Sequence, residues 1–170
     1  LSSRVWIKQA NAECQASLCH WAEPLSAFAS AALGSEYPQG FLDVAWKWLL
    51  KNHPHDSICG CSIDAVHEDM KFRFNQCRQI ADRLAVQAMT KMAASVEGAV
   101  GDKEQRVTVF NPLPRAADGT VELTLQIPTD WPQFNEFFGF EPKPAFRIFD
   151  AAGGEIPYQR LGQAMNRTKV

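Results

Sequence analysis

The sequence predicts an α+β chain, in which an antiparallel three-helix bundle over residues 1–101 is followed by the first strands of an antiparallel β-sandwich over residues 102–170. Apolar residues recur every three or four positions through the first part, which is the period of an amphipathic helix. Seven of the ten prolines lie in the last 69 residues, whereas all five cysteines and four of the five tryptophans precede them. The polar stretch 97–105 joins these two regimes.

The first predicted helix carries one apolar stripe. We expect a bend at Pro24, because proline lacks the amide hydrogen that a helix interior needs, and an end at Gly34, which is a typical stop. The stripe consists of Ile7, Ala10, Cys14, Leu18, Trp21, Leu25, Phe28 and Ala32.

Two further helices are predicted over about residues 39–52 and 64–96, the latter without an internal glycine or proline. Three amphipathic helices with short connections bury their apolar stripes most simply as an antiparallel bundle. Cys14, Cys19 and Cys77 are expected to be small apolar core residues on these stripes. The second and third stripes consist of Phe41, Leu42, Ala45, Trp46, Leu49 and Leu50, and of Val66, Met70, Phe74, Cys77, Ile80, Leu84, Ala88 and Met92.

Four strands are predicted in the second part, over residues 106–110, 120–127, 145–149 and 156–161. The second of them alternates strictly between apolar and polar residues, and a loop rich in proline and phenylalanine follows it. The segment 150–154 is the expected turn between the last two strands. Four strands without a closing partner indicate the opening of a sandwich.

Composition excludes several classes of function. A net charge of -2 from 17 basic and 19 acidic residues gives no basic surface for nucleic acid or an anionic membrane. No apolar run approaches the roughly 20 residues that span a bilayer, and no signal peptide is recognisable. We therefore expect a soluble cytoplasmic protein with reduced thiols. Because the sequence begins without Met inside an expected helix, we also expect a piece of a longer protein.

The segment 52–62 contains the candidate functional residues. Pro54 must end the second helix, which leaves His55 and Asp56 on a loop held by two helices. Ser62 or Asp64 is the expected cap of the third helix. One interpretation makes His55 a metal ligand and Asp56 a hydrogen-bond acceptor for a ligand. The alternative is a purely structural turn, in which the two side chains bond only to each other or to nearby backbone.

Two other interpretations stay open. His53, His55, Cys59 and Cys61 lie close enough along the chain to form a closed structural zinc site, although their spacing is not that of zinc fingers. Tryptophans can also serve as platforms on which sugars stack. Trp46 lies on an apolar stripe and is expected in the core, whereas Trp48 points elsewhere and is the candidate for exposure. The two tryptophans near the N-terminus are Trp6 and Trp21.

The segment AWKWLLKNHPHDSICGCSID, residues 45–64, resembles the central motif of the glycoside hydrolase family 38 α-mannosidases, and is most similar to the bacterial branch that includes the mannosylglycerate hydrolases. LSSRVWIKQ at residues 1–9 and VTVFNPL at residues 107–113 resemble the same family in the same order. The resemblance therefore covers most of the chain, and the His-Asp motif is its specific part.

The resemblance implies a large multidomain enzyme with an N-terminal barrel-like catalytic domain, a three-helix bundle and C-terminal β-sandwiches, of which this chain is a fragment. In the family, the bundle supplies the last protein ligand of a catalytic Zn²⁺, and His55 matches that histidine. Asp56 matches an aspartate that contacts sugar hydroxyls. The nucleophile, the acid/base and the other zinc ligands belong to the absent N-terminal domain, and no position here matches them.

The function implied is that of a zinc-dependent retaining α-mannosidase that hydrolyses terminal α-mannosyl linkages, with a mannoside or mannosylglycerate-type carbohydrate as substrate. The fragment is expected to be inactive alone and to pack against the N-terminal catalytic domain of the same bacterial protein. Homo-oligomerisation is left open. The alternative is a free-standing helical interaction or scaffold module, in which His55 and Asp56 form a structural turn.

Overall fold

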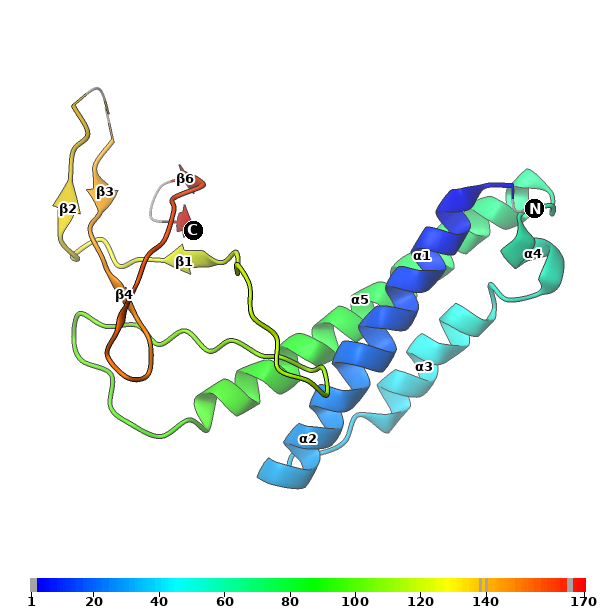
Figure 1. Ribbon diagram of the computed structural model, residues 1–170. Coiled ribbons are helices and arrows are strands. Elements are labelled where there is room, and N and C mark those ends of the chain that lie inside the picture. Colours follow the sequence, from blue (N-terminus) through cyan, green and yellow to red (C-terminus); the bar gives the residue numbers. More distant parts are fainter. Residues whose placement is uncertain (1–2, 138, 140, 165–166) are drawn as a thin grey trace. The chain divides into compact units, whose positions relative to one another are not determined.

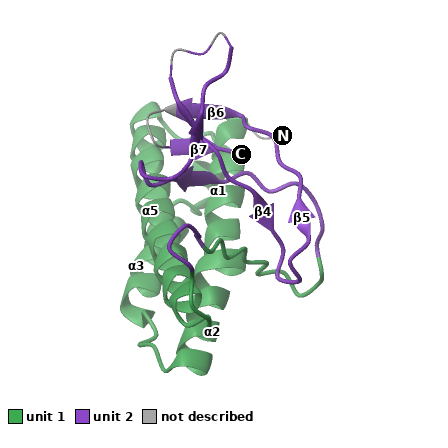
Figure 2. Cartoon of the chain, turned by 90° about the vertical axis from the view of Figure 1, so that its left-hand side faces the viewer, with its two compact units in different colours: residues 1–100, 106–116 green, residues 101–105, 117–170 purple. Residues whose placement is uncertain are grey.

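The chain forms two compact units in a computed structural model that describes residues 3–137, 139, 141–164 and 167–170. The helical unit comprises Leu1–Val100 and Arg106–Ala116, and the strand unit comprises the remainder (Figure 2). The predicted pair of domains, residues 1–101 and 102–170, stays a prediction about the parent protein.

The helical unit is the predicted three-helix bundle (Figure 1). The first rod of the bundle consists of three consecutive segments, and it runs in the same direction as the last long helix, with the middle helix opposed to both. One short helix lies between the middle and last helices. The elements are α1 (Val5–Ala16), η1 (Ser17–Ala22), α2 (Glu23–Leu33), α3 (Gln39–Leu50), α4 (His55–Cys59) and α5 (Asp64–Ala94).

The core lies where α1, η1, α3 and α5 meet. Cys14 and Cys77 are buried in it, as predicted, and the Cys14 thiol donates to the Phe74 carbonyl across 3.4 Å. The prediction for Cys19 is wrong, because its side chain is exposed. The largest fully buried apolar side chains are Ile7, Leu18, Leu42, Leu49 and Met70.

The first rod contains a π-helical turn, η1, where a bend at Pro24 was expected. The Glu23 amide donates to the Leu18 carbonyl five residues back, which is the π pattern. Pro24 then lies in the first turn of α2, where its missing amide hydrogen costs little. The wider turn shifts the buried face by about one residue, so Trp21 and Phe28 are exposed although the apolar period placed them inside. Ala22, Ser26 and Ala29 are buried instead.

Two local predictions beside α5 are wrong. His55 and Asp56 do not lie on a loop, because they begin the short helix α4. The cap of α5 is neither Ser62 nor Asp64: Ile63 occupies the N-cap position and makes no side-chain cap hydrogen bond. Asp64 lies in the first turn of α5 instead, where its negative charge suits the helix dipole.

The strand unit consists of short antiparallel ladders. One sheet has the order β1-β7-β6, and two further pairs are β2-β3 and β4-β5. Thr168 on the central strand β7 and Ile127 beyond β1 are buried. The strands are β1 (Thr124–Gln126), β2 (Gln133–Phe134), β3 (Lys143–Pro144), β4 (Ile148–Phe149), β5 (Glu155–Ile156), β6 (Gly162–Ala164) and β7 (Arg167–Lys169).

The predicted strands are only partly present. The run 106–110 is not a strand, because it finds other partners within the helical unit: Arg106 donates to the Val96 carbonyl at 2.7 Å, and Phe110 packs against the buried end of α2 and α5. Conversely, β2 and β3 lie in the predicted loop. The turn at 150–154 is confirmed, since the Asp150 carboxylate accepts from the Ala152 and Gly154 amides at 2.9 and 2.7 Å.

Within the described residues, no helix combines the length and apolar character needed to cross a bilayer.

Candidate functional site

The candidate site lies on α4, at the end of the bundle where α1 and α5 begin (Figure 1). Pro54, with a ψ of 138°, turns the chain out of α3 and serves as the N-cap of α4. Gly60, with a φ of 91°, ends α4 in the left-handed conformation. Between them, α4 is a single turn that places His55 and Asp56 at its start.

The C-terminal end of α4 is fixed by hydrogen bonds. The amides of Gly60, Cys61 and Ser62 all donate to the Asp56 carbonyl, at 3.2, 3.0 and 3.1 Å. Arg4, which has a φ of 55°, donates its guanidinium to the Gly60 carbonyl and pairs with Asp64 at 2.7 Å. Positive side chains are favourable at this end of a helix. The backbone around the candidate residues is therefore held from α1 and from its own turn.

Lys8 adds a second tie from α1, since its ammonium donates to the Ile58 carbonyl at 2.6 Å. Two buried polar residues flank α4. Asn52 is completely buried after α3, and the buried His67 on α5 has its Nε2 3.0 Å from the Ser62 carbonyl oxygen. His67 therefore joins α5 to the segment that precedes it. These contacts make the turn a rigid support for the side chains that it exposes.

His55 and Asp56 lie side by side on the surface. The His55 Nε2 is 3.0 Å from the Asp56 Oδ1, and the two side chains are 93% and 58% exposed. An exposed imidazole beside a carboxylate can ligate a divalent cation, and the carboxylate can accept hydrogen bonds from hydroxyl groups. The chain thus presents both groups to whatever covers this end of the bundle.

His53 does not join them. Its ring Nε2 lies 2.7 Å from the Asn11 side-chain oxygen on α1, so His53 ties the α3–α4 connection to the bundle. The four residues of the closed structural zinc site are therefore not brought together. Cys59 and Cys61 instead cluster with Asp56, with one potential ligand atom from each within 4.8 Å of the others.

The two thiols of this cluster are close to each other. The Cys59 and Cys61 sulfurs are 3.1 Å apart, and the Cys61 thiol donates to the Asp56 Oδ1 at 3.3 Å. The pKa of the Cys61 thiol is raised to about 11. The largest cause is its hydrogen bond to Cys59, and the next largest is its hydrogen bond to Asp56. The sequence showed two cysteines near each other, but the participation of Asp56 depends on the left-handed turn at Gly60.

Trp46 and Trp48 are engaged in packing within the helical unit, whereas Trp21 is exposed. Trp48, the candidate for exposure, is partly buried: it packs edge-on against Phe72 with ring centroids 5.6 Å apart, and the Lys51 ammonium covers it at 4.7 Å. Trp46 is partly buried against the core, close to what its stripe position predicted. Trp21, at 39% exposure, lies on the outside of η1.

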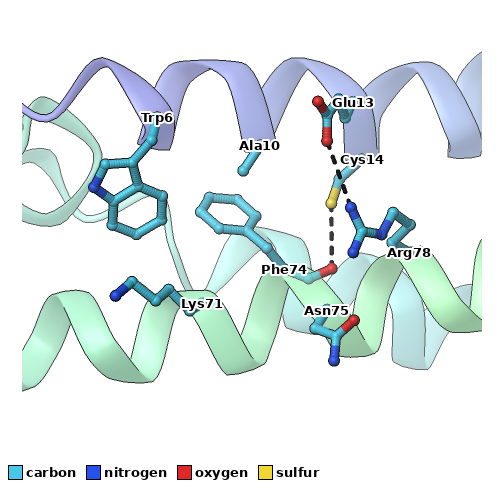
Figure 3. A pocket seen from close by; sticks show the side chains of 8 residues that line it. All are labelled: Trp6, Ala10, Glu13, Cys14, Lys71, Phe74, Asn75 and Arg78. Atoms are coloured by element: carbon cyan, nitrogen blue, oxygen red, sulfur yellow. Dashed lines mark hydrogen bonds and ion pairs between the residues drawn. The ribbon is translucent and has the colours of Figure 1, made fainter.

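A separate hollow lies between α1 and α5 (Figure 3). Its volume of about 160 Å³ is below the roughly 300 Å³ at which ligand pockets begin. Glu13 and Arg78 form an ion pair of 3.6 Å at one side, and Lys71 stands 5.6 Å from the Trp6 ring centre at the other. None of the α4 residues lines it, so it is not part of the candidate site.

The helical bundle matches a known protein family. Residues 1–92 match the family described as "Alpha mannosidase middle domain". The chain belongs to this family. The α-mannosidase middle domain therefore occupies the whole of α1 to the last turn of α5, including α4 and the segment that resembled the family 38 motif.

Individual relatives agree with this assignment. A putative mannosylglycerate hydrolase from Halalkalibacterium halodurans is 38% identical over 106 residues, which are 62% of this chain and 11% of that protein. An α-mannosidase from Enterococcus faecalis superposes with a TM-score of 0.73 at 28% identity, covering 99% of this chain and 21% of that one. A family 38 glycosyl hydrolase from the same species gives 0.69 at 26% identity, with 99% and 22% coverage.

The middle domain and the strands that follow it thus span only about a tenth to a fifth of these proteins. The helices and antiparallel strands thus match part of a larger multidomain glycoside hydrolase, as the resemblance implied.

Proposed function

We propose that this chain is the middle portion of a zinc-dependent retaining α-mannosidase, and that it contributes His55 to the zinc and Asp56 to the sugar. The observation that carries the proposal is the exposed His55–Asp56 pair, held on α4 of a domain that belongs to the α-mannosidase middle domain family. Two residues are assigned to the site, and the rest of its chemistry is assigned to the parent protein.

His55 and Asp56 provide only part of a zinc site. This supports the proposal, because the proposal assigns the other ligands to the rest of the enzyme. Neutral imidazole is a good zinc ligand, and the His55 ring is almost fully exposed. A catalytic zinc needs about three protein ligands, whereas α4 offers one imidazole beside one carboxylate. When bound, the zinc would hold two adjacent mannose hydroxyls and support developing charge. The missing ligands must come from elsewhere in the enzyme.

Asp56 is suited to the sugar. An ionised carboxylate has about four acceptor positions, and the three backbone bonds of the turn go to the Asp56 carbonyl oxygen and leave the carboxylate for other partners. His55 and Cys61 contact the Oδ1 atom. A sugar hydroxyl can therefore donate to this carboxylate while the fixed backbone holds the side chain in place.

The retaining reaction itself requires a carboxylate nucleophile and an acid/base on opposite sides of the scissile bond. We assign both to the N-terminal catalytic domain, against which the end of the bundle that carries α4 would pack. The substrate class that we propose is a terminal α-mannoside, including the mannosylglycerate type named for the H. halodurans relative. We also place the enzyme in the cytoplasm, which suits its five free cysteines.

The test uses the complete parent protein and an aryl α-mannoside. We expect turnover that is lost on treatment with a strong chelator and regained on addition of zinc, with retention of the anomeric configuration by NMR. The 170-residue chain assayed alone should show neither turnover nor stoichiometric zinc. Chelator-resistant activity, an inverted product, or turnover by the isolated chain would each overturn the proposal.

A further inference from the structure

A second group of potential ligands surrounds Asp56, and it consists of Asp56, Cys59 and Cys61. Cys59 at the end of α4 and Cys61 after Gly60 direct their sulfurs toward each other at 3.1 Å, and Cys61 also contacts the Asp56 carboxylate at 3.3 Å. We propose that these three residues form a thiol-based site for a thiophilic divalent cation, distinct from the metal assigned to His55.

The geometry of the turn favours such a site. Because Gly60 is in the left-handed conformation, the chain curls back after α4, and three consecutive amides bond to one carbonyl. Two sulfurs bound to one tetrahedral zinc at 2.3 Å are about 3.8 Å apart, so the present pair at 3.1 Å needs to part by about 0.7 Å. Small rotations of the exposed side chains suffice, and the backbone stays as it is.

The donor chemistry determines which cations fit. Two thiolates and one carboxylate are a soft set that selects thiophilic ions such as cadmium over magnesium and calcium, which prefer oxygen ligands. We expect the site to fill only when such an ion is added in excess, so it does not contribute to the zinc content of the purified protein. The side chains are exposed or partly exposed, so an ion can enter directly and the remaining coordination positions stay open to water. His55 is not required, because, among the described residues, the group whose potential ligand atoms lie within 4.8 Å of one another consists of Asp56, Cys59 and Cys61 alone, whereas the His55 Nε2 contacts only the shared Asp56 Oδ1, at 3.0 Å.

The two sites share Asp56. A cation held by the thiols and this carboxylate draws the Asp56 oxygen away from hydrogen bonds with a substrate. Occupation of the thiol site is therefore expected to inhibit hydrolysis by the complete enzyme. An excess of a thiophilic cation would lower activity through the Cys-Gly-Cys turn.

The experiment is a cadmium titration of the complete, reduced protein, read by the ultraviolet thiolate-to-cadmium charge-transfer band. We expect a stoichiometric band that is lost in C59S and in C61S and that persists in C19S, which removes an exposed thiol far from α4. The band should also persist in His55→Ala, because that variant removes only the proposed catalytic ligand. In D56N the affinity for cadmium should fall at least tenfold, because even the loss of an outer-shell partner of a metal ligand costs roughly 10- to 100-fold.

Three results would overturn the proposal: a wild-type band no larger than that of the C59S/C61S double variant, a band lost in C19S, or a band lost in His55→Ala. Far-ultraviolet circular dichroism of every variant confirms folding, and a variant that fails to fold is replaced by the corresponding Cys→Ala. Because the readout is cadmium binding and not hydrolysis, the result is independent of whether the chain serves an α-mannosidase.

Discussion

Gly60 is the residue on which the shape of the α4 turn depends. Its φ of 91° is one that other residues adopt at a cost, and a Cβ at this position would overlap the Ser3 carbonyl. Gly34 has a similar φ of 65°, but a Cβ there would meet no atom within 4 Å. A side chain at Gly34 would therefore meet only the cost of the left-handed conformation, whereas a side chain at Gly60 would meet that cost and the overlap with Ser3.

Substitution of these glycines by alanine provides the first prediction. Gly34→Ala should lower the free energy of unfolding by about 1–2 kcal/mol, the cost of a left-handed alanine, and Gly60→Ala by more, because the Ser3 segment must also move. The measurement is urea unfolding of the 170-residue chain followed by circular dichroism. Equal losses for the two variants would show that the overlap with Ser3 is unimportant.

Asp56 provides the second prediction. Asp56→Asn keeps the size of the side chain and removes its charge, and hydrogen bonds to a charged group are worth roughly 1.5–3 kcal/mol. We expect kcat/KM of the complete enzyme to fall about 10- to 100-fold while zinc content stays unchanged. A variant with wild-type kcat/KM would show that Asp56 does not contact the substrate.

At this scale the sequence alone predicted part of the site. His55 and Asp56 could be singled out because Pro54 must interrupt the helix and because the surrounding motif resembles a known family. The closeness of Cys61 to the Asp56 carboxylate could not be predicted, because it depends on the left-handed Gly60 and on the anchoring of its carbonyl by Arg4.

Among the elements, η1 shows how a small backbone change alters which residues are buried. The apolar period predicted the first part of the stripe correctly, with Ile7, Cys14 and Leu18 buried. After the π turn the buried face is displaced, and Phe28 is 61% exposed. A period of 3.6 residues contains no information about an inserted π turn, so this displacement was not predictable.

The displaced register gives the third prediction. Leu18→Ala should lower the free energy of unfolding of the 170-residue chain by about 2–5 kcal/mol, since it opens a cavity in the core. Phe28→Ala should cost less than about 1 kcal/mol, because an exposed ring loses little on truncation. Thermal and urea unfolding of both variants measure the difference. A loss for Phe28→Ala as large as that for Leu18→Ala would contradict the register described here.

The two helices α3 and α5 were predicted closely, whereas the short helix α4 and the strands were not. α3 and α5 each have a long, uninterrupted apolar period with clear limits, and both end within two residues of the predicted positions. The strand ladders are two or three residues long, and their existence depends on pairing with distant segments, such as Leu125 opposite Thr168. The apolar–polar pattern of the sequence therefore identified extended segments, but not the strands with which they pair.

For the whole molecule, the exposed apolar side chains of the helical unit are informative. Several large ones are around half exposed or more, on α1, α3 and α5 and beside α4. Apolar side chains of this kind mark a contact with other protein where they form a contiguous patch. They fit a domain that packs within a larger enzyme, as do the small shares of the relatives that the chain covers. Examples are Val5, Phe41, Leu50, Ile63 and Phe72.

Under the proposed function, the motif predicts only part of a zinc site, because a catalytic zinc needs about three protein ligands and the motif offers one histidine. The groups that would complete it are assigned by the same proposal to the parent protein, so the 170 residues cannot predict them. The account therefore depends on a single ligand assignment, that of His55.

That assignment is tested most directly by the zinc content of the complete protein carrying His55→Ala, measured by atomic emission beside wild type. His53→Ala is the matched control, because His53 bonds to Asn11 and lies outside the proposed shell. We expect His55→Ala to lose zinc and hydrolysis of an aryl α-mannoside together, and His53→Ala to keep its zinc. Stoichiometric zinc and full activity in His55→Ala would contradict the account and favour a structural His-Asp turn.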